Sequence, residues 1–168
     1  MHELAGGLWT WTGRHPEWKE GDEWGPVVRS YALQTDESVI LFDPVAPPEE
    51  LTRGRGVEVV LTADWHKRDA PRLGFPIRGD DLPPQVTAQP AFFPGDRSLW
   101  IPEHYALIVG DSLMYGKAIP DEWLEGMSRD DYNAKLRPLL DLPIELLLPT
   151  HGDPVVDDAP GALRRAIG

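Results

Sequence analysis

The sequence predicts an α/β domain in which apolar strands end in polar loops. Three observations support this fold class: short apolar and β-branched runs fill the first half, segments with helical spacing follow, and polar clusters come directly after apolar runs. This order favours a layered α/β or α+β sandwich. A chain of 168 residues can bury one substantial core and is short for two, so we expect a single domain over residues 1–168.

Strands are expected in the first half wherever apolar residues alternate or run together. The alternating segments 8–13 and 27–33 are typical of strands with one solvent-facing side. The continuous apolar runs 38–43 and 57–62 indicate strands that are covered on both faces. Between these two runs, prolines and glycines leave room for little more than one helical turn.

Further strands are predicted at 97–101, 105–114 and 144–149. Helical spacing appears at 128–142, where Ser128 is a suitable N-cap with an aspartate three residues later.

A proline lies within the predicted helical segment 128–142. Pro138 is expected to kink the helix or end it early. The last residues, 158–168, predict a short terminal helix.

Composition and charge exclude several classes of function. The 28 acidic and 16 basic residues give a formal net charge of −12, which repels nucleic acid and acidic lipid surfaces. The absence of cysteine excludes disulfides, thiolate zinc sites and a cysteine nucleophile. Because neither a secretory signal pattern nor a run of about 20 apolar residues is present, we expect a cytoplasmic protein. The expected partner is a small molecule, and Trp18 and Trp24 are candidates for a partially exposed recognition surface or homodimer surface.

Three polar clusters stand where an apolar run ends: TADWHKRD after VEVVL, GDS after YALIV, and THGDP after IELLLP. They offer imidazole and carboxylate groups, from Asp64, His66, Asp69, Asp111 and His151. Mixed nitrogen and oxygen ligands suit zinc, with iron or manganese as alternatives. Each cluster also has a structural interpretation, since Gly-Asp and His-Gly are common in turns and an aspartate often caps a helix.

Taken in this order, the clusters resemble the metallo-β-lactamase superfamily. The resemblance runs from about Leu8 to Pro154 and includes ILFDPV, VVLT, LIVGDSLM and LLLPTHGDP. It implies a four-layer αββα sandwich with metal-binding loops at one edge. It also implies that Asp111 and His151 match the family's bridging aspartate and final histidine.

The first metal motif departs from the family pattern His-x-His-x-Asp-His. Here LTADWHKRDA aligns Asp64, His66, Arg68 and Asp69 with the four ligand positions, so only one ligand is unchanged. Arg68 cannot coordinate a metal, and its permanent positive charge can replace that of a missing ion. The family's Pro-Gly-His turn is represented by Pro-Gly followed by Asp96.

Two functions follow as hypotheses. The resemblance implies one metal ion, zinc first, that is bound by His66, Asp69, Asp111 and His151. Asp64 or Asp69 would then accept a proton during hydrolysis of a small ester, thioester, amide or phosphoester. The alternative is a non-catalytic, metal-free member of the fold that acts as a binding or interaction protein. Arg68 and the absence of the histidine of the Pro-Gly-His turn favour this alternative.

Overall fold

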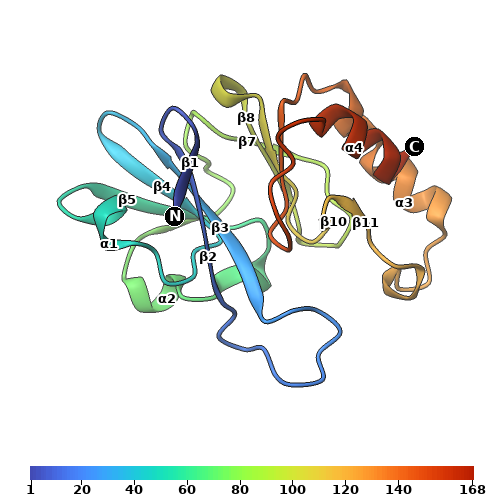
Figure 1. Cartoon of the computed structure of the whole chain (residues 1–168), viewed down its shortest axis with the longest axis horizontal. Helices are drawn as coiled ribbons and strands as arrows, with labels where there is room; N and C mark the ends of the chain where they lie inside the picture. Colours follow the sequence, from blue (N-terminus) through green and yellow to red (C-terminus); the bar gives the residue numbers. More distant parts are fainter. The chain divides into compact units, whose positions relative to one another are not determined.

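Six strands of the first half pair in chain order, from β1 to β6 (Figure 1). The computed structural model describes residues 1–168 and divides them into two units, Met1–Leu82 and Pro83–Gly168. Strands β1 to β4 pair antiparallel, whereas β4, β5 and β6 pair parallel. The six strands are β1 His2–Ala5, β2 Leu8–Arg14, β3 Val27–Gln34, β4 Ser38–Phe42, β5 Gly56–Val60 and β6 Ile77–Arg78.

Short helices connect the parallel strands of the first unit. Helix α1 (Glu49–Thr52) lies between β4 and β5, as the single helical turn predicted there. The segment after β5 forms a 3-10 helix, η1 (Asp64–Lys67), and then helix α2 (Ala70–Leu73). Parallel pairing requires such crossover connections of a dozen or more residues.

Strand β3 corrects one prediction. Its sequence alternates, but all residues from Val28 to Leu33 are buried, so the strand has no solvent-facing side. Its polar residues find partners inside the protein: Arg29 donates to Thr10 Oγ1, and Ser30 Oγ donates to the Asp43 carbonyl at 2.7 Å. Alternation here separates two kinds of buried side chain rather than core from solvent.

A four-stranded sheet in the order β12-β9-β8-β7 organises the second unit. Strands β12 and β9 are parallel, and the other neighbours are antiparallel. The predicted strand 105–114 is divided in two, because Gly110 has a φ of 53° and turns the chain. The strands of this unit are β7 Thr87–Gln89, β8 Ser98–Ile101, β9 Ala106–Ile108 and β12 Leu146–Leu148, with the hairpin β10 Leu113–Met114 and β11 Lys117–Ala118.

The predicted helices of the second half are confirmed. Helix α3 (Arg129–Leu136) begins at Ser128, whose side chain forms a capping box with Asp131. The following residues, Arg137–Asp141, form a 3-10 helix that contains Pro138, so the α-helix ends before the proline as expected.

Helix α4 (Ala159–Ile167) packs against α3, beside it in Figure 1. Two further 3-10 turns, η2 (Pro102–His104) and η3 (Asp121–Trp123), connect the strands and helices of this unit. None of the helices has the length and apolar character that crossing a membrane requires.

Candidate functional site

The register of two parallel strands brings Asp111 and His151 together in the second unit. Leu148 of β12 pairs with Ile108 of β9, and each candidate residue stands three positions after its strand's last paired residue. Parallel strands end at the same edge of a sheet, so both side chains emerge there. The loops that follow the two strands are joined by Thr150, whose hydroxyl donates to the Gly110 carbonyl at 3.2 Å.

Asp111 Oδ1 lies 3.7 Å from His151 Nε2, and the two side chains are 23% and 7% exposed. This separation is too long for a hydrogen bond between the two groups. It is near the roughly 3.4 Å that separates two ligand atoms of a tetrahedral zinc ion with bonds of about 2.1 Å. A protonated His151 would form an ion pair with the same geometry. The pair therefore offers one nitrogen and one oxygen donor suited to a metal.

The residue after Asp111 is fixed from several sides. Ser112 Oγ donates to Asp96 Oδ2 at 3.0 Å and accepts from the Phe92 amide at 2.7 Å. The Ser112 carbonyl accepts from the Tyr132 hydroxyl at 2.6 Å, and burial raises the pKa of Tyr132 to about 12. Asp96 thus bonds to the serine beside Asp111.

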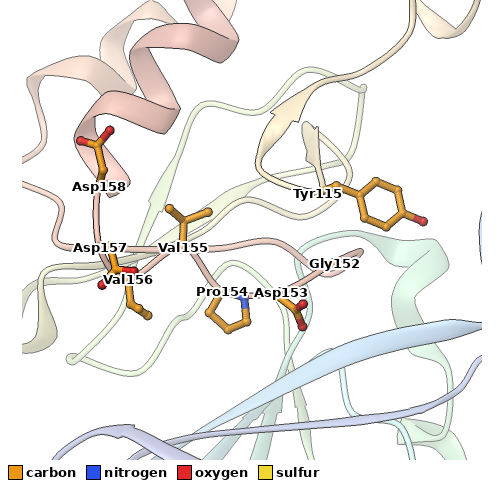
Figure 2. A pocket seen from close by; sticks show the side chains of 8 residues that line it. All are labelled: Tyr115, Gly152, Asp153, Pro154, Val155, Val156, Asp157 and Asp158. Carbon is orange, nitrogen blue, oxygen red and sulfur yellow. The ribbon is translucent and has the colours of Figure 1, made fainter.

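A cavity of about 580 Å³ begins at the residue after His151 (Figure 2). Tyr115 forms one wall, and its amide donates to the His151 carbonyl at 2.7 Å. Gly152 has a φ of 105°, and a Cβ atom there would come within 2.8 Å of Tyr115 Cα, so only glycine permits this approach. The remaining lining residues are Asp153, Pro154, Val155, Val156, Asp157 and Asp158.

The cavity combines apolar walls with negative charge. Val156 and the Tyr115 ring are half exposed and supply apolar surface. Asp158 pairs with Arg165 at 3.0 Å and caps helix α4, so its charge is offset. Asp153 and Asp157 are exposed carboxylates of the same wall, and they make the cavity unfavourable for an anion.

The first unit contains the other predicted site residues. Asp64 begins η1 and is exposed, whereas His66 and Asp69 are buried. Asp69 Oδ2 accepts from the Ala46 amide at 2.8 Å, and its Oδ1 pairs with Arg72. These bonds give Asp69 a structural role in holding the loop that follows β4.

His66 belongs to a buried network with a residue that sequence reasoning missed. Its Nδ1 lies 2.7 Å from Thr62 Oγ1 and 3.3 Å from Asp43 Oδ2. Asp43 also accepts from the Thr62 amide at 2.9 Å and from the Thr62 hydroxyl at 2.6 Å. Burial raises the pKa of Asp43, but His66, Arg68 and Thr62 together lower it below its ordinary value.

Neither unit gathers three or more histidine, aspartate or glutamate side chains in the arrangement of a metal site. The donor set of the second unit fits two ligands of an ion. The set of the first unit fits poorly, because the Arg68 guanidinium bonds to the Asp43 carbonyl and both carboxylate oxygens of Asp69 bond to other groups of the protein. That His66, Asp69, Asp111 and His151 serve one ion stays a prediction.

Comparisons with known proteins identify the fold. No protein-family model matches the sequence, and no curated protein matches it either. A metallo-β-lactamase from Erythrobacter litoralis, with β-mercaptoethanol in its active site, aligns over 98% of this chain and 94% of its own, at 16% identity and a TM-score of 0.63. TTHA1623 in a di-iron-bound form aligns over 83% and 93%, at 21% identity and 0.61. TMB-1 aligns over 99% and 95%, at 10% identity and 0.62.

These similarities confirm the fold class predicted from the sequence. The chain has a mixed α/β fold of the metallo-β-lactamase type, with several sheets and four α-helices.

Proposed function

We propose that the protein is a metal-dependent hydrolase whose ion is held by Asp111 and His151. The observation that carries the proposal is the nitrogen and oxygen donor pair at 3.7 Å, at the shared end of two parallel strands. When bound, the ion would lower the pKa of a coordinated water and polarise the carbonyl or phosphoryl oxygen of the substrate. The protein's part is to fix both ligands through strand register and through the Ser112 bonds, so that little reorganisation accompanies binding.

The cavity beside His151 narrows the substrate class. Its wall of tyrosine, proline and valine side chains suits a small apolar group, and the carboxylates of Asp153 and Asp157 disfavour an anion. We therefore propose a neutral or cationic ester, thioester or amide in preference to a phosphoester. Asp64 and Asp69 are the expected proton acceptors, and substitution of each by asparagine would test this role in hydrolysis.

Metal content tests the proposal directly. Protein purified without chelator should contain about one zinc, iron or manganese per chain by elemental analysis, and Asp111→Ala and His151→Ala should lose it. His104→Ala is the matched control, because His104 lies in the same unit within η2 and away from both strand ends. A neutral aryl ester should be cleaved faster than the corresponding aryl phosphate. Equal metal content in all variants would contradict the assignment of ligands.

A second candidate is a metal-free binding protein of the same fold. One observation favours it: neither unit supplies three ligands by itself, whereas catalytic zinc sites use three protein ligands. It predicts protein without stoichiometric metal and with an unfolding temperature that added zinc leaves unchanged, because an ion bound only by the folded state must stabilise that state.

A further inference from the structure

Two loops of the first unit are joined by hydrogen bonds at the ends of β4 and β5. Asp43 accepts from both the amide and the hydroxyl of Thr62. The Asp69 amide donates to the Pro44 carbonyl at 3.3 Å, and the Ala46 amide returns a bond to the Asp69 carboxylate. The segment 62–69, which corresponds to the family's metal motif, is therefore held to the loop after β4 by the protein's own groups.

The backbone of these loops is strained. Asp43, Ala46 and Arg68 all have positive φ angles, of 44°, 40° and 43°, although none of them is glycine. Residues with a side chain adopt this region at an energetic cost, and the surrounding contacts must offset it. Three such residues in one cluster indicate a conformation fixed by its tertiary contacts.

Arg68 supplies the positive charge in this cluster. Its Nη1 donates to the Arg29 carbonyl at 3.0 Å and to the Asp43 carbonyl at 2.8 Å. The same Asp43 carbonyl accepts from Ser30 Oγ, so the turn after β4 is held from two sides. The Asp43 carboxylate is almost completely buried, and a buried carboxylate remains charged only with compensating donors or cations.

The histidine of the motif is directed into the same network. The Thr62 hydroxyl has one proton, which it donates to Asp43, so it accepts the Nδ1 proton of His66. The imidazole is thereby oriented by the side chains of Thr62 and Asp43 and needs no metal ion for its orientation.

We propose that Arg68 is a built-in cation which takes over the structural role of a metal ion in the segment 62–69, so that the first unit folds without binding an ion. Its guanidinium joins the end of β4 to β3 and offsets the charge of Asp43. The proposal does not depend on whether the second unit binds metal.

The test uses the full chain carrying Asp111→Ala, which removes a predicted ligand of the second unit. In this background, Arg68→Met should lower the unfolding temperature by about 10 °C, because it removes a positive charge near the buried Asp43 and the donor to two carbonyls. Arg68→Lys keeps the charge and loses the planar guanidinium, so its unfolding temperature should fall between those of Arg68→Met and of the protein that keeps Arg68. Arg53→Met is the control, since Arg53 forms an exposed ion pair with Glu49 and should change the temperature by no more than about 1–2 °C.

Zinc and a chelator separate the proposal from a metal site. Neither should change the unfolding temperature of the Asp111→Ala protein, and zinc should not restore that of Arg68→Met. Restoration by zinc, or equal temperatures for Arg68→Met and Arg53→Met, would overturn the proposal. If Arg68→Met does not fold, Arg68→Lys and the zinc titration of Asp111→Ala remain decisive, because both keep the positive charge.

Discussion

Removing the hydroxyl of Tyr132 should lower the stability of the second unit at neutral pH, and this loss should shrink at alkaline pH. The side chain is fully buried, and its hydroxyl donates to the Ser112 carbonyl, next to Asp111. At pH 7, Tyr132→Phe leaves this carbonyl without its donor, which should cost about 1–2 kcal/mol and lower the unfolding temperature by about 2–8 °C.

At alkaline pH the wild-type protein loses the stability that the buried Tyr132 hydroxyl contributes. Burial raises the pKa of Tyr132 from 10.0 to about 12, so the folded state holds its proton more tightly than the unfolded state does. The resulting stability is complete below pH 10 and is lost as the pH rises from 10 to 12. At pH 11 the wild type should have lost about 1.4 kcal/mol through this residue, and beyond pH 12 the loss should approach about 2.7 kcal/mol. Tyr132→Phe cannot lose this contribution.

Urea unfolding followed by circular dichroism between pH 7 and pH 11.5 measures the difference. The stability curves of wild type and Tyr132→Phe should converge above pH 10. Tyr105→Phe is the matched control, because it removes a tyrosine hydroxyl of the same unit from a side chain that is 46% exposed. A Tyr132→Phe curve that stays parallel to wild type up to pH 11.5 would refute the reasoning, since it would mean that the hydroxyl ionises as readily in the folded protein as in the unfolded one.

Two further substitutions test the loop beside His151 and the start of α3. Gly152→Ala should lower the unfolding temperature by several degrees more than Gly126→Ala in thermal scans, because both glycines have positive φ but only the Cβ at 152 would meet the Tyr115 backbone; equal losses would show that the contact is unimportant. Ser128→Ala removes the capping box of α3 and should cost about 1 kcal/mol in urea unfolding. An unchanged urea midpoint would mean that the cap adds no stability.

The strands that the sequence predicts are those with enough residues to show a pattern. Segments of five or more apolar or alternating residues predicted β2, β3, β4, β5, β8, β9 and β12 at the places where they are found, although β9 and β12 are shorter than their predicted segments. The strands that were missed, β1, β6, β7 and β11, have two to four residues, so no period can be recognised in them. Their pairing with a neighbour, rather than their own propensity, makes them strands.

The candidate site shows the same division. Asp111 and His151 were predictable because each follows an apolar run, and the parallel pairing of those runs determines that they meet. Asp43 was not predicted as a site residue, since an aspartate before a proline after a strand is also typical of an ordinary turn. Its burial, its positive φ and its bonds to Thr62 all depend on β5, which lies far along the chain.

His15 is a loop residue that is more buried than its neighbours in the sequence suggest. A position between Gly13 and Pro16 is typical of an exposed turn, but His15 is only 8% exposed. The Trp24 ring packs edge-on against it at 4.7 Å, and the Glu17 amide donates to its Nδ1. The long connection between β2 and β3 is therefore packed by its own side chains, as compact surface loops often are.

Each unit contains a carboxylate and an imidazole close together, and the two pairs differ in how their side chains are joined. Asp43 and His66 are joined through the Thr62 hydroxyl, and Arg68 balances the buried charge, so this pair is stabilised by groups of the same unit. Asp111 and His151 are held 3.7 Å apart by strand register, which is too far for them to bond to each other. An ion that approaches the first pair would have to displace hydrogen bonds and a guanidinium. Metal content should therefore depend on Asp111, and unfolding temperature on Arg68.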